Sequence, residues 1–211
     1  MKYPNFSEEK KLLKRYKTVV GIDEAGRGPL AGPVFACAVV VYKIPKSKTQ
    51  MPKIRDSKKL SPKQREEFHK ILINHKQIQW GIGRASERVI DRINILEATK
   101  LAMKRAVRNL EKKLGKRRIG FLILDGRIKI NLDIPQKSII KGDNKVFSCA
   151  AASIIAKVRR DRLMRKQHKK YPQYGFINHK GYGTKKHMAA LAELGPCKIH
   201  RKSFKPVIRY S

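Results

Sequence analysis

Two adjacent acids, Asp23 and Glu24, end an apolar run within the stretch GIDEAGRGPLAGPV. The same pattern of apolar run, acid and glycine recurs at Asp125 in LILDGR, and Asp143 has a similar setting in IIKGDNKV. Ligands of α/β proteins collect at strand ends, so these acids are expected to lie side by side. Most other acids stand among lysines on expected helices and loops, where ordinary surface ion pairs account for them.

Converging carboxylates with no Cys and no convincing His partner favour a hard cation, Mg²⁺ or Mn²⁺, shared with substrate phosphates. In a basic groove, such a centre indicates two-metal hydrolysis of a phosphodiester. For any single Asp, strand-end capping or a salt bridge to lysine is the simpler interpretation, and the threefold recurrence is what favours a site. Asp23 and Glu24 point to opposite faces of a strand, so both join one site only if the chain turns sharply after Asp23.

The glycine spacing of GIDEAGRG also matches the opening of a phosphate-binding P-loop. Arg27 and Gly28 stand where that motif needs Lys and Ser or Thr, and two acids would face the phosphates. A nucleotide hydrolase is therefore disfavoured.

The chain is strongly basic, with 51 Lys and Arg against 16 Asp and Glu, a net charge of +35. Lys and Arg contacts to phosphates release condensed counterions, so this charge favours nucleic acid as the partner. A solvated basic surface is the simpler alternative, and a non-catalytic basic RNA- or DNA-binding protein is the competing function. That alternative leaves the strand-end acids unexplained. The 211 residues suit one large domain, or one domain with an appendage.

The three cysteines, Cys37, Cys149 and Cys197, are far apart and form no CxxC pair. They are interpreted as small buried thiols in a reducing cytosol. The N-terminus lacks the apolar segment of a signal peptide, and the longest apolar run, 34–42, is too short to cross a membrane. We expect a soluble, cytoplasmic monomer with no membrane partner.

Periodic apolar residues punctuated by Gly and Pro predict alternating strands and helices, an α/β plan. A hairpin is expected from the first two strands, and a polar loop over 43–59. Ser61, Pro62 and Gln64 form a capping box, and Asn94 with Glu97 forms a second helix start. Strands are predicted at 18–23, 34–42, 77–86, 119–125 and 138–141, and helices at 62–75, 94–114, 146–170 and 184–194.

Nine motifs, in order, are similar to those of ribonuclease HII, the type 2 ribonuclease H of prokaryotes. They are GIDEAGRGPLAG, DSKKLS, NILEATKLAM, LILDG, KGD, AAASIIAKVRRD, YPQYGF, HKGYGT and HRKSFKPV, from about residue 18 to residue 207. The resemblance implies a ribonuclease H-like fold, a mixed central sheet flanked by helices, with a C-terminal helical extension. The expected division is a basic N-terminal segment (1–17), a catalytic core (18–145) and a C-terminal helical region (146–211) that packs on the core and helps bind substrate.

The resemblance also implies an endonuclease that hydrolyses the RNA strand of RNA/DNA hybrids and incises 5′ of single ribonucleotides embedded in duplex DNA. The products would carry a 5′-phosphate and a 3′-hydroxyl, and the role would be ribonucleotide removal from DNA. Catalysis and metal ligation are then expected of Asp23, Glu24, Asp125 and Asp143, with two Mg²⁺ or Mn²⁺ ions in the active complex.

Three further segments match substrate-binding positions of the family that this sequence resembles. Gly26, Arg27 and Gly28 would sense the 2′-hydroxyl, the group that separates RNA from DNA. Tyr182 would pack on the sugar of the following deoxynucleotide. The last segment, near the scissile phosphate, is Ser57, Lys58 and Lys59. Taken alone, the glycine segment is as readily a tight turn. Tyr182 by itself is more often a surface or core-edge aromatic, and the charged segment at Ser57 is a polar loop.

Overall fold

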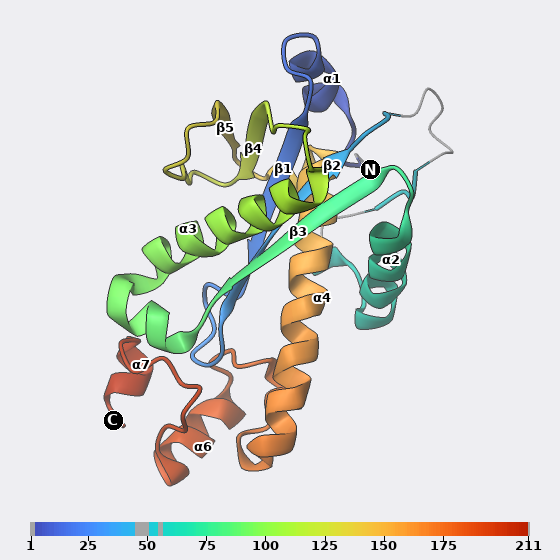
Figure 1. Cartoon of the computed structure of the whole chain (residues 1–211). Coiled ribbons are helices and arrows are strands. Elements are labelled where there is room, and N and C mark those ends of the chain that lie inside the picture. Colours follow the sequence, from blue (N-terminus) through green and yellow to red (C-terminus); the bar gives the residue numbers. More distant parts are fainter. Residues whose placement is uncertain (1–2, 45–50, 55–56, 211) are drawn as a thin grey trace.

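The computed structural model describes residues 3–44, 51–54 and 57–210, and is built on a five-stranded mixed sheet (Figure 1). The strand order is β3-β2-β1-β4-β5, antiparallel from β3 to β1 and parallel from β1 to β5. The first three strands form a meander, and parallel pairing then brings β1 and β4 together. The strands are β1 (Val19–Ala25), β2 (Val34–Val41), β3 (Ile78–Ala85), β4 (Phe121–Asp125) and β5 (Gln136–Ile139).

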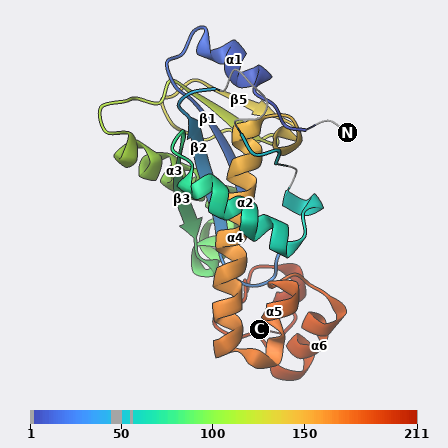
Figure 2. The ribbon, with the colours of Figure 1, turned by 90° about the vertical axis from the view of Figure 1, so that its right-hand side faces the viewer.

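Helices cover both faces of this sheet (Figure 2). Even-numbered apolar residues of β1, β2 and β4 pack on α3 (Glu87–Leu114), and odd-numbered ones face α4 (Phe147–Lys170). Helix α2 (Pro62–Asn74) lies against α4. Side chains that alternate along a strand thus fill two separate cores. Of the helices in the described part of the chain, none is both long and apolar enough to cross a membrane.

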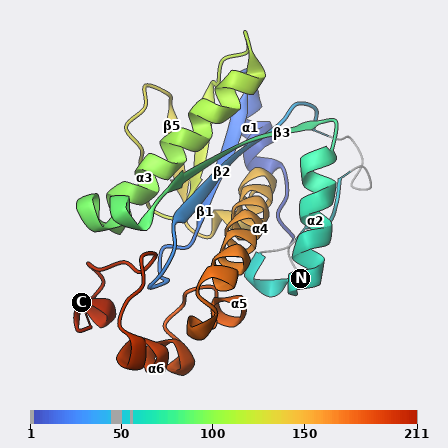
Figure 3. The same ribbon diagram turned by 60° about the horizontal axis from the view of Figure 1, so that its bottom comes forward.

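The remaining helices are short. Helices α5 (Phe176–His179) and α6 (Lys185–Leu194) lie beyond the far end of the sheet, near the C-terminal end of α4 (Figure 3), and α7 (Lys205–Ile208) lies near the N-terminal part of α3 (Figure 1). Helix α1 (Ser7–Leu13) precedes β1. The described residues also form three 3-10 turns, η1 (Ser57–Lys59), η2 (Gly142–Asn144) and η3 (Pro172–Tyr174).

Most predicted elements form, with shifted ends. The Ser61 capping box is present, with both reciprocal hydrogen bonds to Gln64. Asn94 does cap a helical stretch, because its Oδ1 accepts from the Leu96 and Glu97 amides at 2.9 and 3.1 Å. That stretch is preceded by a further helical segment from Glu87, which the sequence pattern did not predict. Strand β5 lies two residues earlier than expected, and residues 45–50 and 55–56 of the expected loop lie outside the described part.

Helix α1, which sequence patterns did not predict, holds α4 in place. Glu9 is 3% exposed, and its Oε1 accepts from the backbone N–H and the hydroxyl of Ser148 at 3.0 and 2.9 Å. A carboxylate there satisfies free N–H groups in the first turn of α4 and complements its dipole. Because Glu9 contacts a helix that begins well over a hundred residues later, no local sequence pattern predicts this contact.

The outer edge of β3 is closed by side chains of α3. Three residues of α3, spaced four apart, donate to carbonyls of alternate β3 residues, so they take the place of a neighbouring strand. This arrangement protects an edge that is otherwise open to pairing with another chain. The contacts are Arg105 Nη1 to the Arg84 oxygen (2.7 Å), Asn109 Nδ2 to the Ile82 oxygen (2.7 Å) and Lys113 Nζ to the Trp80 oxygen (2.8 Å).

Helix α3 approaches β3 closely enough that Gly83 has no room for a methyl group. A Cβ there would lie 2.1 Å from the Ala102 oxygen and 2.5 Å from the Ala106 nitrogen. We expect Gly83→Ala to lower the free energy of unfolding in urea by about 3 kcal/mol, because backbone atoms must move. The control is Gly115→Ala, where a Cβ meets nothing within 4 Å and only the φ of +59° is unfavourable, at about 1 kcal/mol. Equal losses in the two variants would contradict this account of the packing.

Candidate active site

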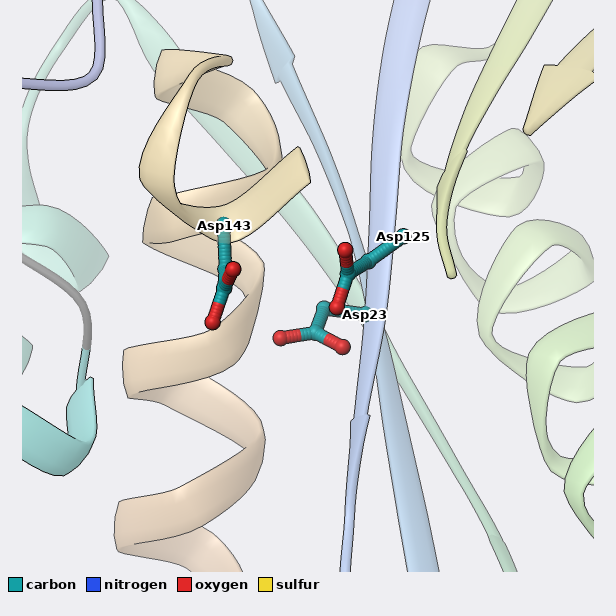
Figure 4. Close-up of side chains that lie close together, drawn as sticks. All are labelled: Asp23, Asp125 and Asp143. Atoms are coloured by element: carbon teal, nitrogen blue, oxygen red, sulfur yellow. The ribbon is translucent and has the colours of Figure 1, made fainter. Parts of the chain in front are cut away.

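Three carboxylates from separate parts of the chain converge beside α4 (Figure 4). Asp23, Asp125 and Asp143 each offer an oxygen that lies within 4.8 Å of the others. Strands β1 and β4 are parallel, with Ile22 beside Leu124, so the next residues, Asp23 and Asp125, stand on the same face. Asp143 approaches from η2, immediately before α4. Parallel pairing and one tight turn therefore build the cluster.

The turn that carries Asp143 is bonded to the end of β4. The Gly142 N–H donates to Asp125 Oδ1 at 2.6 Å, and a Cβ at Gly142 would lie 3.2 Å from that oxygen. Lys141, just before, adopts a left-handed conformation with φ of 57°. Asn144 Nδ2 donates to Asp143 Oδ1 at 2.9 Å. A side chain at position 142 would thus crowd Asp125, and two carboxylates of the cluster have fixed hydrogen-bond donors.

Burial and like charge act together on this cluster. Asp23 and Asp143 are each 4% exposed. Burial raises the pKa of Asp23 well above its usual range, and the charges of Glu24 and Asp125 raise it further. Hydrogen bonds from Ser153 and from the Glu24 amide oppose this rise in pKa. The ionised cluster therefore calls for a cation, and its all-oxygen donor set suits Mg²⁺ or Mn²⁺.

Ser153, on the buried face of α4, was not anticipated from the sequence. It hydrogen-bonds Asp23, and its Oγ lies 2.9 Å from the Ser57 Oγ. Ser57 is 3% exposed, so its hydroxyl faces the interior, whereas Lys58 and Lys59 beside it are exposed. The signal that could have found Ser153 is a hydroxyl in the apolar helix start CAAASIIA.

Glu24 lies next to the three-acid cluster without belonging to it, within the described ranges. The sharp turn after Asp23 that would bring both acids to one face is absent, because β1 continues to Ala25 and Glu24 keeps the opposite orientation. Its Oε1 lies 3.4 Å from Arg27 Nη1. Burial raises the pKa of Glu24, the Arg27 charge opposes this, and the Asp125 charge adds to it. Electrostatic interaction with Asp125 thus links Glu24 to the cluster.

The glycine-rich loop after β1 is held from inside by Arg201. This side chain is fully buried and donates to the carbonyls of Gly26 (2.6 Å), Arg27 (2.7 Å) and Gly32 (2.9 Å). In a trans peptide the C=O and the N–H point in opposite directions. The amides of Arg27 and Gly28, which share peptides with the first two carbonyls, therefore point away from Arg201.

A second buried arginine, Arg160, joins this loop to the segment that carries Tyr182. It is 1% exposed and donates to the carbonyls of Pro33, Ala31 and Lys180, each at 3.0 Å. Burial lowers the pKa of Arg160 to about 10. A Cβ on Gly26 would lie 2.1 Å from the Arg160 Nε, so glycine is required there, where φ is +97°. Sequence patterns had placed neither arginine in the interior.

Tyr182 lies beside the glycine-rich loop with much of its ring open to solvent. It is 44% exposed, and its Cε1 lies 3.8 Å from where a Cβ on Gly28 would be. The Lys157 ammonium and the Arg160 guanidinium lie 5.8 and 6.0 Å from the ring centroid. The structure therefore brings together two of the three expected substrate segments, although they are more than 150 residues apart.

Sequence comparison identifies relatives over nearly the whole chain. A family model described as Ribonuclease HII matches residues 20–207. A curated ribonuclease HII of Geotalea uraniireducens is 49% identical over 209 residues, covering 98% of this chain and 92% of that protein. A ribonuclease HII of Chlamydia caviae is 50% identical over 200 residues, covering 95% and 90%.

Solved structures show the same fold. The ribonuclease H2 of Pyrococcus horikoshii superposes with a TM-score of 0.75 at 24% identity, covering 92% of this chain and 96% of that one. The ribonuclease HII in a PCNA complex from Archaeoglobus fulgidus gives 0.66 at 25% identity, covering 83% and 87%. A Bst ribonuclease HIII solved with Mn²⁺ gives 0.72 at 16% identity, covering 92% and 68%. The expected mixed sheet with flanking helices is confirmed.

Replacing one buried acid should separate electrostatic strain from metal binding. In metal-free buffer, we expect Asp23→Asn to raise the free energy of unfolding by about 1 to 2 kcal/mol, because it removes like-charge repulsion and a costly buried charge. Added Mn²⁺ should raise the melting temperature of the wild type and leave that of Asp23→Asn nearly unchanged.

The matched control is Glu193→Gln, which neutralises an exposed acid on α6. It should behave as the wild type in both measurements. A full Mn²⁺ response in Asp23→Asn would remove Asp23 from the metal centre.

Proposed function

The chain belongs to the ribonuclease HII family and hydrolyses the RNA strand of RNA/DNA hybrids, and we propose that Asp23, Asp125 and Asp143 form its metal-dependent catalytic centre, with Glu24 at its edge. The observation that carries this proposal is the convergence of three carboxylates within 4.8 Å, with Asp23 inside β1, Asp125 as the last residue of β4 and Asp143 in η2. Incision 5′ of single ribonucleotides embedded in duplex DNA follows from the family.

The residues present fit divalent ions. The donors are all oxygens, two of the three acids are almost fully buried, and their mutual repulsion favours a cation among them. Two Mg²⁺ or Mn²⁺ ions, when bound, would activate water and stabilise the leaving 3′-oxygen, giving 5′-phosphate and 3′-hydroxyl ends.

The chain's own contribution is to hold the acids in place. Ser153 orients the Asp23 carboxylate by a hydrogen bond, and the Ser153 hydroxyl is itself hydrogen-bonded to that of Ser57. The Gly142 amide fixes Asp125. Glu24 reaches the cluster from the other face of β1, close enough for its charge to raise the pKa of Asp23. It would therefore add a fourth carboxylate from the side that also carries Arg27.

We propose that Gly26, Arg27 and Gly28 test the sugar at the cleavage position for a 2′-hydroxyl. Support comes from Arg201, which fixes two carbonyls of this loop and so orients the Arg27 and Gly28 amides away from the protein interior. Rigid amides placed in advance are suited to a group that both donates and accepts hydrogen bonds.

Tyr182 would pack on the following deoxynucleotide, since its exposed ring lies next to Gly28. Lys58 and Lys59 are exposed and would contact the nucleic-acid backbone, and the Lys58 charge lowers the pKa of Glu24. For Ser57, the buried hydroxyl favours an indirect role through Ser153.

The C-terminal helical region, 146–211, is proposed to help bind substrate. Arg160 and Arg201 both come from it, and both hold the loop that follows β1. The core would be 18–145 and the N-terminal segment 1–17. We propose that the protein acts as a monomer on RNA/DNA hybrid and on duplex DNA that contains ribonucleotides, with the net charge of +35 drawing in the polyanion.

The direct test is incision of a DNA duplex containing one ribonucleotide, with Mg²⁺ or Mn²⁺. The wild type should cut on the 5′ side of the ribonucleotide and stop when the metal is chelated. Asp125→Asn should lower the cleavage rate by about three orders of magnitude, while hybrid binding stays within about twofold, because the substitution removes a ligand and keeps the shape. Glu193→Gln is the matched control. Rapid cutting by Asp125→Asn, or cutting in chelator, would refute the proposed centre.

A further inference from the structure

Three histidines of the C-terminal region, two buried and one half-buried, form a cluster away from the acids. They are His179 at the end of α5, His187 in the first turn of α6 and His200, and we refer to them as the histidine chain. His187 is fully buried and His200 is 2% exposed. The rings of His179 and His187 stack, with centroids 4.5 Å apart and planes 15° from parallel.

The hydrogen bonds of His200 and His187 fix which nitrogen of each ring carries the proton. His200 Nδ1 lies 2.9 Å from the Cys197 amide and must accept, so its proton is on Nε2. That nitrogen lies 2.9 Å from His187 Nε2, which accepts in turn. The His187 proton is therefore on Nδ1, which donates to the Tyr182 carbonyl at 2.9 Å. Each N–H in this series donates in the same direction, from the Cys197 amide through His200 and His187 to the Tyr182 carbonyl.

The hydrogen bonds of His179 also fix the position of its proton. Its Nε2 must donate to the Tyr174 carbonyl at 2.8 Å, and its Nδ1 accepts from the Gly181 amide at 3.2 Å. All three rings are thus neutral, each with one donor and one acceptor in use.

Neutral rings are also what burial favours. Burial lowers the pKa of His187 and of His200 to about 4, and lowers that of His179. A proton added to His200 Nδ1 would face the Cys197 N–H, and one added to His187 Nε2 would face the His200 N–H. The described surroundings of His187 and His200 hold no carboxylate that raises either pKa.

The segment held by these rings has an unusual backbone. Lys180 and Gly181 have φ of 52° and 88°, in the left-handed region. Tyr182 then places its N–H on the His179 carbonyl (2.9 Å), while its C=O accepts from both His187 and the Thr184 amide (2.9 Å). Every backbone polar group of Tyr182 is bonded, and its side chain is 44% exposed. The fixed backbone therefore presents a ring that is open to a partner.

We propose that His179, His187 and His200 are positioning residues. Their neutral imidazoles fix the position of the Tyr182 ring beside Gly28. In this way they control the enzyme's preference for substrates with a junction between a ribonucleotide and a following deoxynucleotide. This inference rests on the proposed function of Tyr182. None of the three histidines contacts the substrate. They act through the Tyr182 backbone, to which His187 and His179 are hydrogen-bonded.

The test compares kcat/KM on two substrates, a DNA duplex with one embedded ribonucleotide and a uniform RNA/DNA hybrid. His187→Leu removes the donor to the Tyr182 carbonyl and should lower the ratio of the two values, embedded over uniform, about tenfold. His187→Asn keeps an N–H at the position of Nδ1 and should stay within about twofold of the wild type. A merely structural role would lower both activities together, and an unchanged ratio in His187→Leu would overturn the inference.

Tyr182→Ala separates this inference from the function on which it rests. If Tyr182→Ala leaves the ratio unchanged, the proposed role of Tyr182 is wrong. If it lowers the ratio and His187→Leu does not, only the histidine chain is wrong. In the Tyr182→Ala background, His187→Leu should have no further effect on the ratio, because both changes act through one ring.

A measurement on the wild type covers the case in which His187→Leu does not fold. Long-range ¹H–¹⁵N correlation at pH 7.5 should find three neutral rings, with the proton on Nδ1 of His187 and on Nε2 of His179 and His200. A charged ring, or the opposite tautomer at His187, would overturn the inference.

Discussion

Repulsion among buried carboxylates is the constraint on which the rest of this structure depends. Asp23 and Asp125 stand side by side because β1 and β4 pair in parallel, and Asp143 closes the cluster from η2. Unpaired buried charge is costly, and the fold meets that cost with fixed donors, a hydroxyl from Ser153 and an amide from Gly142. The remaining repulsion is the physical reason for which we propose a divalent cation among the three acids.

Buried positive charge, in contrast, holds the glycine-rich loop after β1 and the segment that carries Tyr182. Arg160 and Arg201 are buried cations whose nitrogens donate to backbone carbonyls, and burial lowers the pKa of both. A guanidinium presents several donors in a rigid fork, so a single side chain can tie together segments that are distant in sequence. Arg160 ties the glycine-rich loop to Lys180, and the histidine chain then fixes Tyr182. The proposed sugar-binding segments and the proposed metal ligands are thus held by separate sets of contacts, and both sets involve β1 or the loop that follows it.

Much of the fold could be predicted, since strand runs and capping boxes are local. The Ser61 box and the Asn94 cap are present because their hydrogen bonds close within three residues. Strand β1 runs past Asp23 to Ala25, because pairing with β2 extends it beyond the point where the glycines alone suggested a turn. Helix α1 was missed because Glu9 is stabilised by a helix end distant in the sequence.

The sequence by itself determined the chemistry. Acids after apolar runs, placed in a chain of net charge +35, indicated a metal-dependent enzyme acting on nucleic acid. Only the tertiary structure decided which acids converge, and it left Glu24 on the other face of β1, because alternation along a strand is strict. It also decided the contacts of Ser153, Arg201 and His187. Their partners are fixed by packing between distant segments, and residue type alone says nothing about which groups burial will bring together.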